Sequence, residues 1–168
     1  MIPTPSLHVR SARPEDLPSI GRLGAALVGH HHSLDPLRFF KAEHLEEGYA
    51  SFLGGELGRK RSVLLVAEQR GEGGAGTVVG YAWGRLEGRD WENLLDACGK
   101  LHDVYVDPSA RSLGAGRALC EEMLRRLMDM GAPRVVLSTA AGNAPAQRLF
   151  ESLGFRRTMI EMTRERET

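Results

Sequence analysis

Cysteine is scarce in this chain of 168 residues, which has only Cys98 and Cys120 and no CxxC pair. This excludes a disulfide-stapled scaffold and a cysteine-rich zinc site, so we expect a reducing compartment and a cytoplasmic location. Excess charge is also lacking, because 22 basic residues balance 22 acidic ones. No overall positive field attracts nucleic acid or an anionic membrane surface, so neither is an expected partner and any anion site must be local.

Long apolar runs are missing as well. The longest strongly apolar run covers residues 63–67, and the first residues lack the basic and apolar regions of a secretory leader, so we expect no membrane span. No repeat or Pro/Ser-rich linker divides the chain. At about 100–200 residues per domain, the length predicts a single domain over residues 1–168.

Hydrophobic periodicity predicts the element order βααββ-βαβαβ. Strands are expected at 7–10, 62–69, 77–86, 101–106, 134–138 and 155–164, with a hairpin loop at 71–76. Helices are expected from Pro14 to a break at 30–36, and at 42–53, 112–130 and 144–153. One face of strand 77–86 carries Val78, Gly80, Ala82 and Gly84, which are mostly small, so a helix or ligand can approach it closely. The order predicts an α/β fold with helices packed on a mixed sheet.

The most informative segment is residues 104–119, VYVDPSARSLGAGRAL, a strand followed by a glycine-containing turn that begins a long helix. Gly114 and Gly116 lack Cβ atoms, so backbone N–H groups at the helix N-terminus can approach an anion, and Arg111 and Arg117 add positive charge. Taken alone, the two glycines are equally consistent with a tight turn. The segment lacks the Lys of a P-loop, and Leu119 replaces the third small residue of a dinucleotide-binding fingerprint.

The pattern that fits is R-x-x-G-x-G after a strand ending in Val, here Arg111 to Gly116, which resembles the acyl-CoA pyrophosphate loop of the GNAT superfamily of N-acetyltransferases. Residues 9–17 are similar to the entry of the first strand and helix in that family. Residues 143–155 resemble its N-x-x-A-x-x-L-Y-x-x-L-G-F segment. The resemblance covers nearly the whole chain and implies the GNAT fold, a mostly antiparallel twisted sheet with helices on both faces and a splayed central strand pair.

The resemblance also implies acetyl-CoA as co-substrate. In such folds the main chain of the strand before the loop binds the acyl group and pantetheine, the loop binds the pyrophosphate, and a helix further on contacts the pantetheine arm and thioester. Carried to this chain, the expected cofactor-binding residues are Val104, Tyr105, Val106, Arg111, Ser112, Leu113, Gly114, Ala115, Gly116, Arg117, Asn143, Ala146 and Phe150. Asn143 is also a plain N-cap for the following helix, and Phe150 is also a plain core residue.

Two catalytic questions follow from the resemblance. Many family members have a Tyr general acid where this chain has Phe150, which has no proton to donate. The leaving thiolate is then protonated by Tyr105, Tyr81 or water, or it leaves unprotonated. Leaving unprotonated is possible because a thiol has a pKa of about 8.5. Residues 101–106 resemble the L-E-D-x-x-V strand of polyamine-type members, and His102 stands where those have a candidate base. His102 is therefore either the base or relay for the amine, or a strand histidine without a catalytic role. Simple alternation places His102 with Val104, opposite Tyr105.

The acceptor site is less clearly indicated. The triplet His30 to His32 does not have the spacing of a metal site, and we expect no metal. The resemblance implies that the triplet lies in the loop between the first two helices, which commonly lines the pocket for the acetyl acceptor. The candidate acceptor-binding residues are His31, His32, Asp35, Phe39 and Trp83. The resemblance thus predicts direct transfer of acetyl from acetyl-CoA to a primary amine, in a small molecule or in a protein. The alternatives are a non-catalytic acyl-CoA-binding module and an interaction subunit. A homodimer with residues 155–164 pairing across its interface is also expected.

Overall fold

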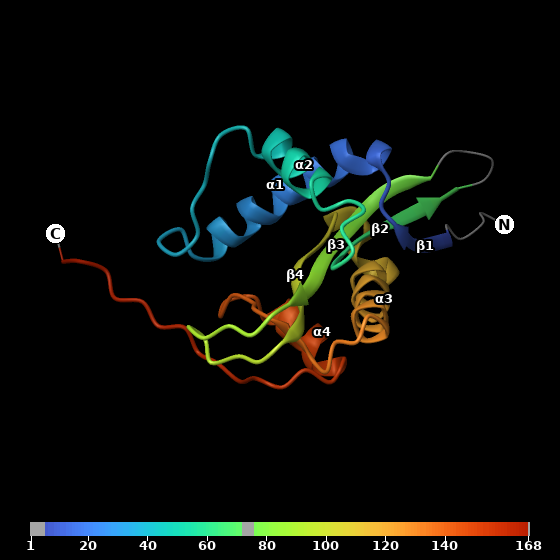
Figure 1. The fold of residues 1–168 in the computed structure, drawn as a ribbon. Coiled ribbons are helices and arrows are strands. Elements are labelled where there is room, and N and C mark those ends of the chain that lie inside the picture. Colours follow the sequence, from blue (N-terminus) through green and yellow to red (C-terminus); the bar gives the residue numbers. More distant parts are fainter. Residues whose placement is uncertain (1–5, 72–75, 168) are drawn as a thin grey trace.

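The computed structural model describes residues 6–71 and 76–167, so most of the expected hairpin loop at 71–76 lies outside the described residues. Five strands form one sheet in the order β1-β2-β3-β4-β5, in which the first four are antiparallel and β5 runs parallel to β4 (Figure 1). Their bounds are β1 (Ser6–Ser11), β2 (Ser62–Arg70), β3 (Thr77–Glu87), β4 (Cys98–Val106) and β5 (Val135–Leu137).

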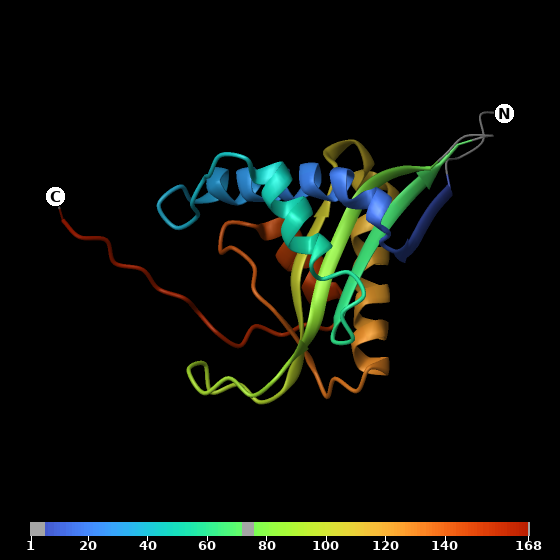
Figure 2. The same cartoon turned by 45° about the horizontal axis from the view of Figure 1, so that its top comes forward.

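Helices cover both faces of the sheet (Figures 1 and 2). On one face lie α1 (Leu17–Leu34), which follows the short 3-10 turn η1 (Pro14–Asp16), and α2 (Leu45–Gly54). On the other lie α3 (Ala115–Asp129), after the 3-10 turn η2 (Pro108–Leu113), and α4 (Ala144–Ser152). The expected GNAT-type mixed sheet with helices on both faces is therefore confirmed.

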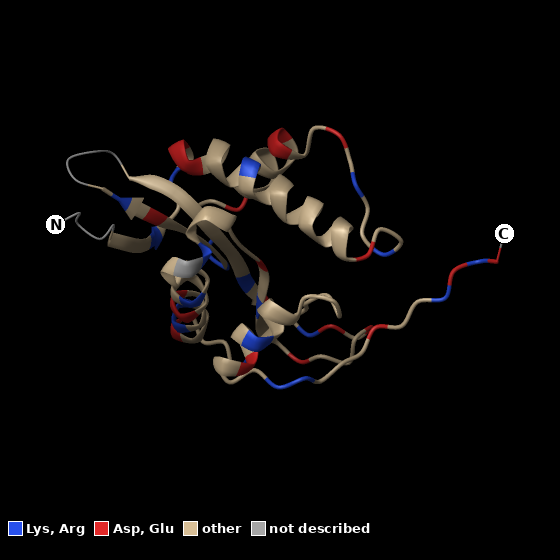
Figure 3. Ribbon diagram, turned by 180° about the vertical axis from the view of Figure 1, so that it is seen from behind, with Lys and Arg blue, Asp and Glu red and all other residues tan. Residues whose placement is uncertain are grey.

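Each face of the sheet has its own apolar core, because strand side chains alternate between the faces. The core between the sheet and α1 includes Ile20, Leu23, Leu27, Leu53, Leu64, Val66, Tyr81 and Trp83. The core between the sheet and α3 includes Val63, Leu65, Ala82, Leu101, Leu119, Met123, Leu127 and Phe150. Acidic and basic residues are interleaved along α3 (Figure 3).

The small face of β3 accommodates a helix. A Cβ added to Gly84 would lie 2.8 Å from the sulfur of Met123 on α3 and 2.9 Å from the carbonyl oxygen of Lys100 on β4. A Cβ at Gly80 would lie 3.0 Å from the carbonyl oxygen of Tyr105. The glycines therefore let α3 pack directly on the sheet, which leaves the opposite face of β3 for Tyr81 and Trp83.

The pairing of β4 with β5 is short. Only Gly99 to Leu101 pair with Val135 to Leu137, so the last five residues of β4 run past the end of β5. Such a gap matches the splayed central strand pair that the family resemblance implies. It leaves one edge of β4 without a partner strand at the point where the chain enters η2.

Three expectations are corrected by the structure. The predicted break at 30–36 is wrong, because α1 continues to Leu34 and ends just before Pro36, where a residue preceding proline leaves the helical region. The closing strand expected at 155–164 is also wrong, because these residues pair with no strand among the described residues. The long helix begins at Ala115 instead of residue 112, since η2 occupies the turn before it.

Candidate functional site

The open edge of β4 presents main-chain hydrogen-bonding groups. The N–H of Asp107 donates to the carbonyl oxygen of Val79, so in this antiparallel ladder the odd-numbered residues bond to β3. The N–H and C=O groups of Val104 and Val106 therefore point away from β3, toward the edge that β5 leaves uncovered. The carbonyl oxygen of Val106 accepts a hydrogen bond of 3.2 Å from Nε of Arg111.

The N-terminus of α3 lies directly beyond this edge. Gly114 has a φ of 78°, a left-handed conformation that favours glycine, and it turns the chain from η2 into α3. The first intrahelical bond is from the N–H of Ala118 to the carbonyl oxygen of Gly114, and no described side chain caps the helix. The N–H groups of Ala115, Gly116 and Arg117 are thus available to an anion, which the helix dipole also favours.

Gly116 lies in the first turn of α3, and a small side chain would fit at its position. A Cβ at this position would meet only Cδ2 of Leu149 at 3.5 Å and Cγ2 of Val106 at 3.8 Å, both ordinary contacts. Packing therefore does not require glycine here, although glycine weakens a helix relative to alanine.

Two arginines flank the helix N-terminus and contact neighbouring residues. The guanidinium of Arg111 lies 5.6 Å from the ring centre of Tyr105, and that of Arg117 donates a 2.6 Å hydrogen bond to Oγ of Ser152. Ser112 and Leu113 complete the 3-10 turn between them.

The α4 residues have structural roles in the ligand-free chain. Oδ1 of Asn143 accepts a 3.3 Å hydrogen bond from the N–H of Ala146, so Asn143 is the N-cap of α4. Ala146 packs against the core, and Phe150 is 7% exposed within it, edge-to-face with Phe155 at 5.9 Å between ring centres. Their contacts with a pantetheine arm stay predictions.

A β-bulge in β4 corrects the expected placement of His102. Trp83 pairs with Asp103 and Gly84 with Leu101, so His102 is the extra residue. The bulge turns the His102 ring onto the face of Trp83, with the two rings stacked 4.3 Å apart between centres. His102 therefore lies on the same face as Asp103 and Tyr105, and not with Val104 as simple alternation predicts.

His102 is held by a second residue that the sequence analysis missed. Its Nε2 lies 3.0 Å from Oε1 of Glu87, and Glu87 also pairs with Nε of Arg85 at 3.1 Å. Burial lowers the pKa of His102 below its ordinary value, although the hydrogen bond and charge of Glu87 act in the opposite direction. The neutral ring therefore predominates near pH 7, and because the Glu87 carboxylate can only accept, it fixes the proton on Nε2. This leaves the Nδ1 lone pair as a base.

Asp103 is the other acidic residue that sequence reasoning missed on this face. Its Oδ2 accepts a 3.1 Å hydrogen bond from the hydroxyl of Tyr81, and no hydrogen bond to its Oδ1 is found among the described residues. Burial raises the pKa of Asp103, while the Tyr81 hydrogen bond and the charge of His31 act in the opposite direction. The pKa of Tyr81 is itself raised well above the ordinary value by burial. Strand alternation alone places Asp103 on the face of Tyr105, and the regular register opposite Trp83 puts it within reach of Tyr81.

The predicted acceptor residues are only partly brought together. His31 and His32 belong to the last turns of α1, where the His31 ring stacks obliquely on Phe39 at 4.9 Å between centres. Nδ1 of His32 lies 2.8 Å from the carbonyl oxygen of Phe39, and Oδ1 of Asp35 accepts from two backbone N–H groups of the following turn. The charge of His31 acts on the Asp103 carboxyl, whereas His32 and Asp35 hydrogen-bond to the loop after α1. Trp83 contacts His102 and Phe52 instead.

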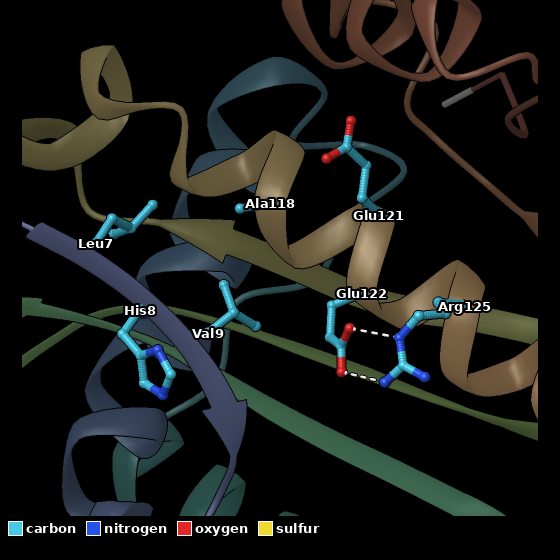
Figure 4. Close-up of a pocket in the computed structure, with 7 residues that line it drawn as sticks. All are labelled: Leu7, His8, Val9, Ala118, Glu121, Glu122 and Arg125. Carbon is cyan, nitrogen blue, oxygen red and sulfur yellow. Dashed lines mark hydrogen bonds and ion pairs between the residues drawn. The ribbon is translucent and has the colours of Figure 1, made fainter.

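Other features of the surface lie apart from this site. A hollow between β1 and α3 is lined by Leu7, His8, Val9, Ala118, Glu121, Glu122 and Arg125, and its Glu122 and Arg125 hydrogen-bond to each other (Figure 4). A second hollow surrounds ion pairs of Arg10 with Asp16 and Glu68. Neither contains a predicted site residue. Among the described residues no three His, Cys, Asp or Glu side chains gather as a metal site would need, and no helix is long and apolar enough to cross a membrane.

The fold and the β4–α3 junction define an α/β protein that presents an uncapped helix N-terminus beside an open strand edge. Comparison with known families identifies the class further, because residues 30–155 match the Acetyltransferase (GNAT) family. The chain belongs to this family of acetyltransferases, for which acetyl-CoA is the co-substrate. The GNAT resemblance of the sequence motifs is thereby confirmed.

Individual relatives agree with this assignment. A mycothiol acetyltransferase of Thermomonospora curvata is 43% identical over 89 residues, which cover 52% of this chain and 30% of that protein. One from Acidothermus cellulolyticus is 37% identical over 111 residues, 61% of this chain and 32% of that protein. The chain thus spans about a third of the length of these curated relatives.

Solved structures show the same fold. A tetramutant of the BH1408 protein from Bacillus halodurans has a TM-score of 0.78 at 20% identity, covering 94% of this chain and 99% of that one. The aminoglycoside N-acetyltransferase AAC(6')-Iy in complex with CoA has a TM-score of 0.69 at 18% identity, covering 99% and 98%. At these identities the likeness establishes the fold alone.

Proposed function

We propose that the chain transfers the acetyl group of acetyl-CoA to the primary amine of a small molecule, by direct attack in a ternary complex. The observation that carries the proposal is the β4–α3 junction, where free N–H groups, Gly116 and an unpaired strand edge converge. Acetyl-CoA supplies a thioester whose carbonyl is open to attack. The chain's own residues hold that group, keep the acceptor amine neutral and orient it.

In this proposal the first turn of α3 binds the pyrophosphate, with Arg111 and Arg117 turning from their present partners toward it. The free main-chain groups of Val104 and Val106 hydrogen-bond the pantetheine arm and the acyl carbonyl as an added strand would. Asn143 contacts the pantetheine arm from the start of α4. Phe150 presents its ring edge from the core toward the thioester.

His102 acts as the base. An alkylammonium has a pKa of about 10, so the amine must lose a proton before it attacks. Nδ1 of a neutral His102 accepts that proton, directly or through water, and Glu87 stabilises the resulting imidazolium through Nε2. The stacked Trp83 ring keeps the imidazole in this orientation.

The leaving thiolate needs no protein acid in this scheme. Phe150 has no proton to donate, and the Tyr81 hydroxyl is already committed to Asp103. The Tyr105 hydroxyl lies 3.5 Å from a guanidinium nitrogen of Arg111, whose positive charge favours an anion nearby. A thiol pKa of about 8.5 allows the thiolate to leave near neutral pH, with water as proton source.

The acceptor class rests on the face that carries His102. Asp103 offers a carboxylate oxygen there, next to Tyr81 and near His31, which suits an amine substrate. The relatives named as mycothiol and aminoglycoside acetyltransferases support a small molecule over a protein. A protein amine acceptor and a non-catalytic acyl-CoA-binding module are the alternatives.

A thermal-shift titration with acetyl-CoA, CoA, NAD and ATP tests the binding step. A ligand at about 100 times its Kd adds about 2.7 kcal/mol of stability, and we expect this for acetyl-CoA and CoA only. A panel of small amines, with peptides alongside, then tests turnover. Absence of a CoA shift overturns the proposal, a shift without turnover on any amine supports the binding module, and turnover on peptides alone supports the protein acetyltransferase.

His102→Ala tests the base. We expect kcat/KM to fall roughly 10²–10⁴-fold and its acidic limb to disappear, which are the usual consequences of losing a general base. His8→Ala is the matched control, because His8 is exposed on β1, away from the site. An unchanged kcat/KM and pH profile in His102→Ala would remove His102 from the mechanism while leaving the acetyl-CoA site standing.

A further inference from the structure

The end of α2 packs against the residues that hold His102. Phe52, in the last turns of α2, lies edge-on to Trp83 with 5.1 Å between ring centres, and His102 stacks on the same Trp83 ring. Glu56 follows two residues after α2 ends, and it is only 5% exposed. A buried carboxylate thus lies on the side of the sheet that carries the proposed base, although the mechanism so far gives it no role.

One oxygen of this carboxylate is partnered and the other is not. Oε1 of Glu56 lies 3.5 Å from Nε of Arg59. Oε2 is buried and accepts no hydrogen bond from any described residue. The Arg85 guanidinium faces it without reaching it, because Nη1 of Arg85 lies 4.0 Å from Oε2, too far for a hydrogen bond. A buried oxygen without a donor costs free energy, so Oε2 has a site ready for a cation that moves closer.

Arg85 is paired instead with Glu87, the residue that holds His102. Nε of Arg85 lies 3.1 Å from Oε1 of Glu87, and Nη2 donates to Oε2 at 3.4 Å. The same Oε1 lies 3.0 Å from Nε2 of His102. Burial lowers the pKa of His102, Glu87 raises it, and the positive charges of Lys100 and Arg85 lower it further. Arg85 therefore lies between two carboxylates and shares one of them with the base.

We propose that Arg85 is a positioning residue that moves from Glu87 to Glu56 when His102 takes a proton from the acceptor amine. This inference rests on the proposed role of His102 as the base. While the ring is neutral, the charges of Arg85 and Glu87 compensate each other. Once Nδ1 of His102 holds the amine proton, the imidazolium and Arg85 compete for Glu87, and Oε2 of Glu56 has no other donor among the described residues. The exchange gives each cation a carboxylate, and no proton leaves the guanidinium.

The pKa of His102, followed by NMR, tests the exchange without any substrate. His102→Ala identifies its signal among those of the six histidines. Glu56→Gln should lower the pKa of His102 by roughly half a unit, because Arg85 then has no second carboxylate and stays beside the ring. Arg85→Gln should raise the pKa of His102, since a positive charge is removed. Glu47→Gln is the matched control, because Glu47 is exposed on α2 and its loss should leave the titration of His102 unchanged.

A double-mutant cycle separates the exchange from a plain effect of charge. Loss of the Glu56 charge by itself would lower the pKa of His102 whether or not Arg85 is present. The exchange predicts that Glu56→Gln has no effect on this pKa in an Arg85→Gln background. The acidic limb of kcat/KM should follow the NMR titration in each active variant. A shift of the same size in both backgrounds, or a shift in neither, overturns the inference.

Crystal structures of the wild-type chain above and below the pKa of His102 give a second test, which holds even if Arg85→Gln does not fold. At the lower pH the Arg85 guanidinium should donate to Oε2 of Glu56. A guanidinium that stays on Glu87 at both pH values contradicts the inference. Neither the titration nor the crystal structures require turnover. Failure of this inference is therefore distinct from failure of the base role, which would appear as unchanged kcat/KM in His102→Ala.

Discussion

Gly116→Ala should change the stability of the protein and its affinity for CoA in opposite directions. The added methyl has space, because its nearest protein atoms lie at 3.5 and 3.8 Å. Replacing glycine by alanine in a helix stabilises by about 0.5–1 kcal/mol. For a chain of this size that raises Tm by about 1–4 °C.

The same methyl should obstruct the ligand. It would project between Val106 of β4 and Leu149 of α4, where we place the phosphate-bearing arm of CoA. Loss of one charge-assisted hydrogen bond costs about 1.5–3 kcal/mol, which corresponds to a roughly 10- to 100-fold increase in the Kd for CoA. Differential scanning calorimetry measures the first effect and isothermal titration with CoA the second.

Gly114→Ala is the informative comparison. Gly114 has a φ of 78°, so alanine there should cost about 1–2 kcal/mol and lower Tm. Gly114→Ala should therefore lower Tm, whereas Gly116→Ala should raise it. An unchanged Kd for CoA in Gly116→Ala would refute the placement of the ligand, and a lowered Tm would show that packing, not a ligand, requires glycine at this position.

Three further predictions concern the opposite face and the core. Glu87→Gln should move the acidic limb of kcat/KM to lower pH, because removing the carboxylate charge lowers the pKa of His102 further; an unmoved limb in the pH profile would separate Glu87 from His102. Asp103→Asn should be more stable than the wild type to urea at pH 7. Burial raises the folded-state pKa of Asp103, so the ionised carboxylate destabilises the fold above that pKa. The difference in unfolding free energy between Asp103→Asn and the wild type should therefore become smaller as the pH falls toward 4. Met123→Ala should lose about 2–5 kcal/mol of unfolding free energy in calorimetry, since Met123 is fully buried under Gly84, while CoA binding at 20 °C persists.

Much of the fold follows from patterns in short stretches of sequence. The alternation of residues 77–86 predicts β3 to within one residue, and the apolar run at 62–69 predicts β2 equally well. Helix boundaries are predicted less accurately. The break expected from His30 onward is absent because histidines can continue a helix, and α1 ends only before Asp35 and Pro36. The closing strand at 155–164 has strand-like residues but pairs with no strand among the described residues, and a strand forms only where it pairs.

The sequence by itself determined the β4–α3 junction, the end of the site that we propose binds the pyrophosphate. Its requirements are local: a strand, a proline turn, a glycine that adopts positive φ and a helix start all lie within residues 104–119. The base side of the site was decided only by tertiary structure. A one-residue bulge in the pairing of β4 with β3, some twenty residues away, turns His102 onto Trp83 and Glu87. The regular register beside the bulge places Asp103 opposite Trp83, within reach of the Tyr81 hydroxyl. Strand register depends on packing across the whole sheet, so no contiguous motif carries it.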